Sequence, residues 1–223
     1  MIHGENRGQR GGRRPPGGLP LAVGIGASTG GPRALLTLLA DLSLPVPAYV
    51  FLVQHIHPKF VGILSRRLED VSPLPVQEAE DQAVIQPGRL YLAPGNCHLM
   101  VERVGPVRYR TRLTDDPPRH GVRPSIDILF DSVAEAFGPR GIGVVLTGMG
   151  RDGLAGARAI KARGGAILAE SSETCVVYGM PRVLAEAALV DQMVPIRDMA
   201  AAIRQTCMEV AGAPESAASP VPK

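Results

Sequence analysis

Three polar residues of the types needed for acyl transfer each follow a predicted β-strand. They are Ser28 after the apolar run Leu21–Ile25, His55 after Ala48–Val53, and Asp152 after Gly141–Thr147. A serine becomes a nucleophile when a base takes its proton, and the base needs a carboxylate that fixes its tautomer. The three residues therefore indicate a hydrolase that forms an acyl-enzyme, with Ser28 as nucleophile, His55 as base and Asp152 as the acid that orients the base.

Glycines surround Ser28 and permit a tight turn that exposes its side chain. Pro32 and the leucines that follow it at helical spacing predict a helix directly after this turn. The N-terminus of such a helix offers N–H groups and positive potential to an oxyanion. A serine in a glycine-rich turn is also common as a helix cap, so Ser28 alone does not establish an active site.

Known glycine motifs do not account for this turn. The G-x-S-x-G pattern around Ser28 matches the elbow of α/β-hydrolases, but in those enzymes the histidine comes after the acid, and here the last histidine, His120, precedes Asp152. A dinucleotide-binding fingerprint fails because Thr29 stands where its third glycine belongs, and the lysine of a phosphate-binding loop is missing.

Other titratable residues have simpler interpretations. His55 and His57 could form a metal pair on one face of a strand, but no further His or Cys cluster supports them, so we expect neither a metal nor a cofactor. Asp152 could also cap a helix that begins near Gly153. Cys175 adjoins a Val-Val run that we expect to be buried, which favours a core position over a nucleophile.

Three further aspartates are alternative acids for the base, and they are Asp115, Asp116 and Asp127. Asp127 falls in the first turn of a predicted helix, where the helix dipole alone would favour a carboxylate.

The elements that must position these residues alternate between strands and helices, which is typical of a parallel α/β sheet. Besides the three strands above, the sequence predicts strands at 89–93 and 166–169, a hairpin over 99–112, and helices near 32–39, 126–137 and 154–163. The expected fold is a doubly wound, mostly parallel sheet flanked by helices, with a short antiparallel hairpin. Because the carboxyl ends of parallel strands share one edge, the three polar residues can converge there.

Composition bounds the remaining possibilities. The net charge of +3 resides in residues 1–20, and the rest of the chain has 20 basic and 20 acidic residues, so no nucleic-acid partner is expected. Three dispersed cysteines, the lack of a secretory signal and the lack of an 18-residue apolar run predict a cytoplasmic protein without membrane insertion. We expect one domain over 21–210, unstructured tails at 1–20 and 211–223, and a monomer.

Six motifs in order resemble the catalytic domain of the chemotaxis receptor methylesterases (CheB) over roughly residues 21–207. They are Ile25-Gly26-Ala27-Ser28-Thr29-Gly30-Gly31-Pro32, Gln54-His55, Leu92-Ala93-Pro94-Gly95, Arg123-Pro124-Ser125-Ile126-Asp127, Leu146-Thr147-Gly148-Met149-Gly150-Arg151-Asp152-Gly153 and Tyr178-Gly179-Met180-Pro181. The resemblance implies hydrolysis of glutamate γ-methyl esters on the cytoplasmic helices of chemoreceptors, with release of methanol, and in some members deamidation of receptor glutamine.

Carried over position by position, the resemblance assigns the triad to Ser28, His55 and Asp152. It places the oxyanion on the backbone N–H of Met149, and we expect the N–H of Thr29 to be the second donor. Four basic residues are candidates for a substrate-binding rim, and they are Arg33, Lys59, Arg123 and Arg151. A binding module without catalysis would be expected to lack a triad position, and none is lost here.

The sequence departs from the family at three places. Ile56-His57-Pro58-Lys59 replaces the Met-Pro that follows the base histidine in the family, and His120-Gly121-Val122 precedes Arg123. Both changes affect the expected rim of the site. Only a short tail precedes the first strand, where the usual family member has a receiver domain. We therefore expect either a stand-alone methylesterase or part of a longer gene product, with a separate response-regulator or receiver domain as a partner.

Overall fold

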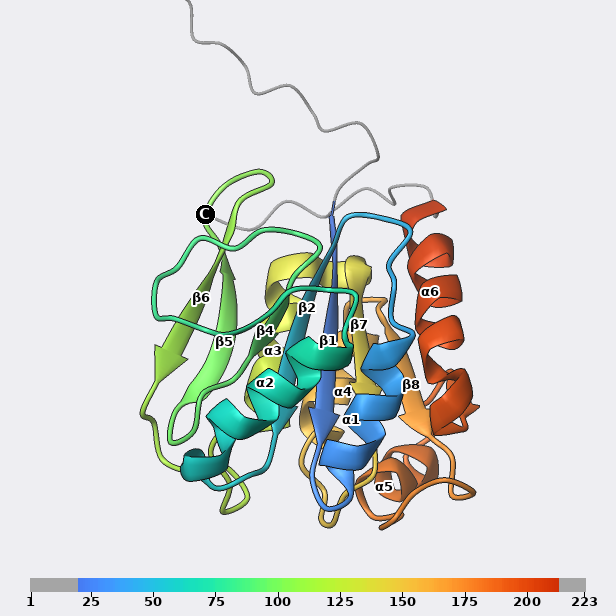
Figure 1. The fold of residues 1–223 in the computed structure, drawn as a ribbon. Helices are drawn as coiled ribbons and strands as arrows, with labels where there is room; N and C mark the ends of the chain where they lie inside the picture. The colour runs from blue at the N-terminus through green and yellow to red at the C-terminus, as the bar shows by residue number, and fades with distance from the viewer. Residues whose placement is uncertain (1–19, 213–223) are drawn as a thin grey trace, which may run out of the picture.

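A computed structural model describes residues 20–212 and shows one parallel sheet between two layers of helices (Figure 1). Seven strands lie in the order β3-β4-β2-β1-β7-β8-β9, and all neighbours are parallel. Their bounds are β1 Leu21–Ala27, β2 Ala48–Gln54, β3 Val76–Glu78, β4 Leu90–Leu92, β7 Gly141–Val145, β8 Ala166–Glu170 and β9 Gln192–Val194. The long apolar strands are central and the three-residue strands β3 and β9 form the edges, so β1 and β2 are buried along their whole length.

Helices cover both faces of the sheet and close a hydrophobic core on each. One core packs α1 (Gly31–Ala40), α2 (Val61–Val71) and α6 (Ile196–Gly212) against the sheet. The other packs α3 (Ile126–Phe137), α4 (Leu154–Ala162) and α5 (Met180–Glu186). Figure 1 shows α1 and α2 in front of the sheet and α3 and α4 behind it. The two short 3-10 helices are η1 (Pro58–Phe60) and η2 (Gly138–Arg140).

An antiparallel hairpin of β5 (His98–Arg103) and β6 (Tyr109–Thr114) extends the α3 side of the domain. Tyr109 stacks on Phe137 of α3 with ring centroids 4.2 Å apart, and the Val101 N–H donates to the Ser132 hydroxyl. The hairpin therefore packs directly on the helix whose N-terminus lies near Asp152.

A glycine in β1 brings α3 close to the sheet. A Cβ at Gly26 would lie only 2.6 Å from the Ile126 side chain, so a larger residue there would push away the first turn of α3. This close packing sets the position of the α3 N-terminus relative to the end of β1.

The predicted fold class is confirmed, and the predicted hairpin and the helix at 126–137 are present. The sequence analysis did not predict α2, α5, α6, β3 or β9. The predicted start of the C-terminal tail, Ala211, is two residues too early, because α6 continues through Gly212. The rest of both expected tails, 1–19 and 213–223, lies outside the described residues. Between residues 20 and 212, no helix is both long enough and apolar enough to cross a bilayer.

Candidate active site

Ser28 and His55 lie side by side because they follow neighbouring parallel strands. Ala27, the last residue of β1, is opposite Gln54, the last residue of β2. The His55 N–H donates to the Ala27 carbonyl at 3.0 Å, which extends the ladder one residue beyond β2. On the other side of β1, the strand β7 leads into the segment that carries Asp152. The order β2-β1-β7 thus brings all three sequence-predicted residues to one edge of the sheet.

The Gln54 side chain braces the nucleophile segment against the base segment. Its Nε2 donates to the carbonyls of both Ser28 and His55, each at 2.9 Å. Gln54 is 3% exposed, so these two bonds form away from bulk water. Its Oε1 is buried without a hydrogen-bond partner in the described part of the chain.

His55 and Asp152 are 97 residues apart in the sequence, but their side chains form a close pair. The His55 Nε2 lies 2.9 Å from Asp152 Oδ2, and both side chains are largely buried. An ionised carboxylate only accepts hydrogen bonds, so this contact places the imidazole proton on Nε2 and leaves the lone pair on Nδ1. The pair has the geometry expected of a base and its orienting acid.

The Asp152 carboxylate also caps the N-terminus of α3. Oδ2 accepts from the Ile126 N–H at 2.7 Å, and Oδ1 accepts from the Ser125 hydroxyl at 2.8 Å and the Asp127 N–H at 3.1 Å. The Gly153 N–H, before α4, also donates to Oδ1. Burial alone would raise the pKa of the Asp152 carboxyl, but the bonds from His55 and from the start of α3 lower it below its ordinary value.

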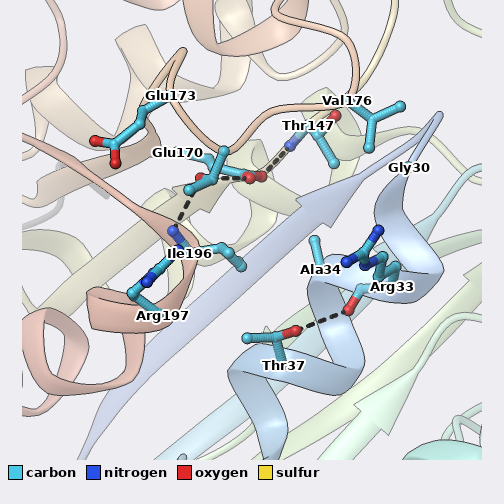
Figure 2. Close-up of a pocket in the computed structure, with 11 residues that line it drawn as sticks. Gly30, Arg33, Ala34, Thr37, Thr147, Glu170, Glu173, Val176, Ile196 and Arg197 are labelled. Atoms are coloured by element: carbon cyan, nitrogen blue, oxygen red, sulfur yellow. Dashed lines mark hydrogen bonds between the residues drawn. The ribbon is translucent and has the colours of Figure 1, made fainter.

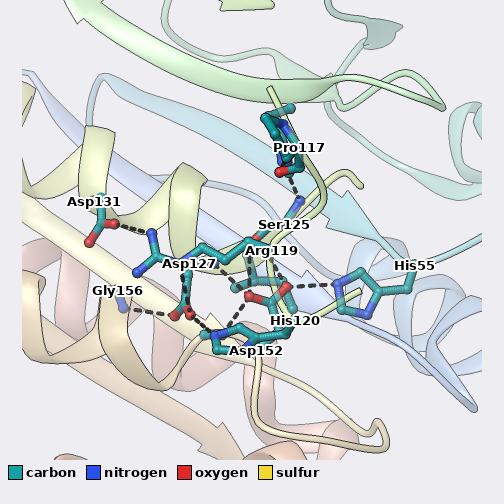
Figure 3. A network of polar contacts seen from close by, with 12 residues as sticks. His55, Pro117, Arg119, His120, Ser125, Asp127, Asp131, Asp152 and Gly156 are labelled. Atoms are coloured by element: carbon teal, nitrogen blue, oxygen red, sulfur yellow. Dashed lines mark hydrogen bonds and ion pairs between the residues drawn. The ribbon is translucent and has the colours of Figure 1, made fainter. Parts of the chain in front are cut away.

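A second buried carboxylate stands behind Asp152 (Figure 3). Asp127 is fully buried, and it accepts from the Gly156 N–H at 2.8 Å and contacts His120 Nε2 at 3.0 Å. Arg119 lies 3.6 Å from the same carboxylate and also pairs with Asp131 at 2.9 Å. Asp127 therefore does more than complement the helix dipole, because its bond to the Gly156 N–H joins α3 to α4 next to Asp152.

Among residues 20–212, one group could hold a metal ion. It consists of His120, Asp127 and Asp152, which offer ligand atoms within 4.8 Å of one another. Every carboxylate oxygen in the cluster already accepts at least one hydrogen bond, and both oxygens of Asp152 accept two or more. We therefore assign the cluster to hydrogen bonding that fixes Asp152.

The peptide groups of the two sequence-predicted oxyanion donors are held by bonds to their carbonyls. The Ser28 carbonyl accepts from Gln54 and from the Gly31 N–H, and the Gly148 carbonyl accepts from the N–H groups of Gly179 and Met180. In a trans peptide the N–H points opposite to the carbonyl, so these bonds fix the directions of the Thr29 and Met149 N–H groups. Within residues 20–212 neither N–H donates to another protein group.

Gly148 lies against Ser28, and this contact tolerates no side chain. A Cβ at Gly148 would be 2.7 Å from the Ser28 Cβ and 2.8 Å from the Met180 methyl group. The segment that ends at Met149, which is 75% exposed, is thus in direct contact with the candidate nucleophile.

The sequence predicts an ester hydrolase, and replacing Gly148 with alanine should lower the kcat of that predicted reaction by about 10²-fold, because the added methyl would displace Ser28 or the Met149 peptide by several tenths of an ångström. Gly62→Ala in α2 is the matched control, since a Cβ there meets nothing closer than 3.7 Å. Steady-state kinetics and thermal melting of both variants check the prediction. Equal activity of the two variants would contradict the contact described here.

The four basic residues predicted as a rim fall in different places. Arg123 lines a small cavity of about 200 Å³ together with His55, but its guanidinium donates to the carbonyls of Asp115 and Asp116. Arg33 lines a separate cavity on the α1 side. Lys59 in η1 and Arg151 before Asp152 are exposed. The rim arginine that shares a cavity with the base is therefore engaged with its own loop.

The structure differs from one rejected alternative and from one expectation about neighbouring residues. His55 and His57 do not share a strand face, because β2 ends at Gln54, and His57 Nδ1 instead accepts from the Lys59 N–H at the start of η1. The run after Cys175 is not buried, since Val176 is 62% exposed. Burial raises the pKa of the Cys175 thiol to about 12, which does not suit a nucleophile.

Four residues of the site were not predicted as contributors, and they are Gln54, Ser125, Thr147 and Glu170. The first three lie within the six family motifs given above. Their position as polar residues in those motifs was the signal that could have predicted a role in the site. Glu170 had a weaker signal, as an acid directly after a predicted buried strand.

A family model described as CheB methylesterase matches residues 23–203. Among curated relatives, protein-glutamate methylesterase/protein-glutamine glutaminase 2 of Nitratidesulfovibrio vulgaris is 44% identical over 182 residues, and the similarly named protein 5 of Myxococcus xanthus is 46% identical over 183. The alignments cover 81% and 82% of this chain but 49% and 52% of the relatives. The chain therefore spans about half the length of the curated relatives it matches.

A solved structure has a similar fold, and nearly the whole length of that solved chain aligns with this protein. The CheB methylesterase catalytic domain of Thermotoga maritima aligns with a TM-score of 0.80 and 38% identity, covering 83% of this chain and 98% of that chain. The match accounts for the seven-stranded parallel sheet and its flanking helices.

Proposed function

The chain belongs to the CheB methylesterase family, and from this premise we propose that it hydrolyses the γ-methyl esters of glutamate side chains in proteins. The observation that carries the proposal is the 2.9 Å contact of His55 Nε2 with Asp152 at the strand edge that holds Ser28. A capped, ionised carboxylate, an oriented imidazole and an adjacent serine are the groups that acyl transfer needs.

In the proposed first half-reaction, the Ser28 oxygen attacks the ester carbonyl carbon while His55 Nδ1 takes the hydroxyl proton. The negative charge on the former carbonyl oxygen is bound by the N–H groups of Thr29 and Met149. The intermediate then expels the methoxy group, which receives the proton from His55 and leaves as methanol. The product of this step is an ester between Ser28 and the glutamyl side chain.

In the second half-reaction water attacks that ester, and His55 takes a proton from the water. Collapse of the second tetrahedral intermediate returns the proton to the Ser28 oxygen and releases the glutamic acid side chain, which then loses its own proton to water and becomes the carboxylate. Asp152 stays ionised throughout and stabilises the imidazolium that forms in both halves. No step draws on a metal or cofactor.

The proposed substrates are methylated helices of chemoreceptors. The domain acts on them in the cytoplasm as a monomer. Positive charge around the site comes from four basic residues, which are Arg33, Lys59, Arg123 and Arg151. The free thiols of Cys97, Cys175 and Cys207 suit a reducing compartment. Control of access by a separate response-regulator protein is part of the same proposal.

Deamidation of glutamine is the second proposed activity, because the relatives' names pair the methylesterase with a protein-glutamine glutaminase. Attack on an amide passes through the same tetrahedral oxyanion, and ammonia leaves instead of methanol.

The test is to incubate the chain with receptor protein methylated with labelled methyl groups and to measure volatile methanol, and in parallel to measure ammonia from an unmethylated, glutamine-containing receptor. Methanol release supports the esterase, and ammonia release supports the deamidase. If neither product exceeds that of a heat-inactivated control, both activities are excluded for this chain.

A further inference from the structure

Thr147, just beyond β7, joins three separate loops through every polar group it has. Its N–H donates to Glu170 Oε2 at 2.8 Å, and its carbonyl accepts from the Ser28 N–H at 3.0 Å. Its hydroxyl donates to the Thr29 carbonyl at 3.0 Å and accepts from the Val177 N–H at 2.9 Å. The residue is 1% exposed, so little water competes for these bonds.

Glu170, at the end of β8, holds Thr147 from behind (Figure 2). Its second oxygen accepts from the Thr174 hydroxyl at 2.9 Å, and that hydroxyl accepts from the Ile196 N–H at the start of α6. Glu170 is fully buried, and within residues 20–212 no lysine, arginine or histidine lies within ion-pair distance of it.

A buried carboxylate without a cation is costly, so its presence calls for a specific use of its two acceptor oxygens. Here both oxygens accept from donors in the loops that surround the nucleophile. Neither Glu170 nor Thr147 contacts the His55–Asp152 pair in the bonds described above. The two residues therefore stand beside the catalytic groups and fix the backbone that carries them.

We propose that Glu170 and Thr147 act as a positioning clamp that locks the nucleophile turn at Ser28–Thr29 to the Gly148–Met149 loop, an inference that rests on the proposed function. The clamp sets the distance between the two N–H groups that bind the oxyanion. A donor displaced by about an ångström loses much of its effect on the transition state, while ground-state binding of the substrate is little changed.

The loop after β8 also restricts the movement of the Gly148–Met149 loop. The Gly148 N–H donates to the Val177 carbonyl at 3.0 Å, so the loop after β8 contacts both Thr147 and Gly148. Loss of the Thr147 hydroxyl would release the Thr29 carbonyl and the Val177 N–H together. The nucleophile turn and the Met149 loop could then shift relative to each other while β1, β7 and both cores stay packed.

The test compares Thr147→Val with Thr147→Ser, and Glu170→Ala with Glu170→Gln, using p-nitrophenyl acetate turnover and the rate at which a fluorophosphonate labels Ser28. Thr147→Val should lower kcat and the labelling rate by about 30- to 100-fold with KM within about 2-fold, and Thr147→Ser should stay within about 3-fold of the parent. Glutamine can still accept from the Thr147 N–H, so Glu170→Gln should retain activity within about 5-fold, whereas Glu170→Ala should follow Thr147→Val.

Thr206→Val is the matched control, because Thr206 is also a buried threonine but its hydroxyl bonds within α6 to the Ala202 carbonyl. It should melt at a lower temperature and keep its kcat. If Thr147→Val also melts lower but keeps its kcat, or if Thr147→Ser and Glu170→Gln restore nothing, the clamp is overturned.

Where Glu170→Ala does not fold, the Thr147→Val and Thr147→Ser pair decides. A parent protein whose Ser28 reacts with neither probe would instead overturn the proposed function. That result is distinguishable because it appears before any clamp variant is measured.

Discussion

Replacing Ser28 with alanine is expected to abolish methanol release, with kcat lower by about 10⁴- to 10⁶-fold, while the protein stays folded. The expected loss is large because the acyl-enzyme bond forms to the serine oxygen, which alanine lacks. The fold should survive because the described hydrogen bonds of Ser28 use only its backbone, through Thr147, Gln54 and Gly31. Alanine keeps all three contacts, so the melting temperature should change by no more than about 2 °C.

Ser132→Ala is the control with the opposite expectation. The Ser132 hydroxyl is buried where α3 packs on the hairpin strand β5, and it donates to the Leu129 carbonyl and accepts from the Val101 N–H. Its loss should destabilise the domain by about 1–3 kcal/mol and leave kcat unchanged. A folded Ser28→Ala protein that released methanol at the parental rate would remove Ser28 from the mechanism.

The parts of the fold that the sequence predicted well are those in which local pattern and burial agree. The predicted runs at 21–25, 48–53 and 141–147 are apolar and bounded by turns, and they correspond to the central strands β1, β2 and β7, with bounds that differ by one or two residues. The triad candidates could be grouped from the sequence because parallel strands share a carboxyl edge. That these three strands are direct neighbours was supplied only by the structure.

The predictions missed the two edge strands and helix α6 for different reasons. The edge strands β3 and β9 have three residues each, too few to show an alternation. Helix α6 did carry a helical pattern, with Met199, Ile203 and Cys207 buried at intervals of four, so its absence from the predictions was an error of reading.

The bonding network of the site could not be predicted from the sequence, because it depends on how far side chains reach between elements. Gln54 was visible beside the base, but its bond to the Ser28 carbonyl requires β1 and β2 to be in register. Glu170 meets Thr147 only because β8 pairs with β7. Asp127 was assigned to the helix dipole, whereas the structure surrounds it with Gly156, His120 and Arg119.

Replacing Asp152 with asparagine is expected to lower kcat by about 10³- to 10⁴-fold at neutral pH. Five donors converge on the carboxylate, and an amide offers only one oxygen to them. With that oxygen facing Ser125, Asp127 and Gly153, the amide NH₂ faces His55 Nε2 and must donate to it. The imidazole then carries its proton on Nδ1, where it cannot accept one from Ser28.

The opposite orientation of the amide restores the bond to His55 but sets the NH₂ against the three donors at Oδ1, leaving them without an acceptor. Each buried donor left unpaired costs about 1–3 kcal/mol, so this orientation is disfavoured. The favoured orientation still sets the NH₂ against the Ile126 N–H, which loses its acceptor, so Asp152→Asn should also melt at a lower temperature than the parent. Nitrogen chemical shifts of the His55 ring separate the two states, because they report which ring nitrogen is protonated.

Asp131→Asn is the matched control, since it makes the same chemical change on α3 at a residue that pairs with Arg119 rather than with His55. It should leave the His55 tautomer and kcat unchanged. An Asp152→Asn protein that keeps more than about a tenth of the parental kcat, with the proton still on Nε2, would show that the acid does not set the tautomer. The role of Asp152 would then be limited to capping α3.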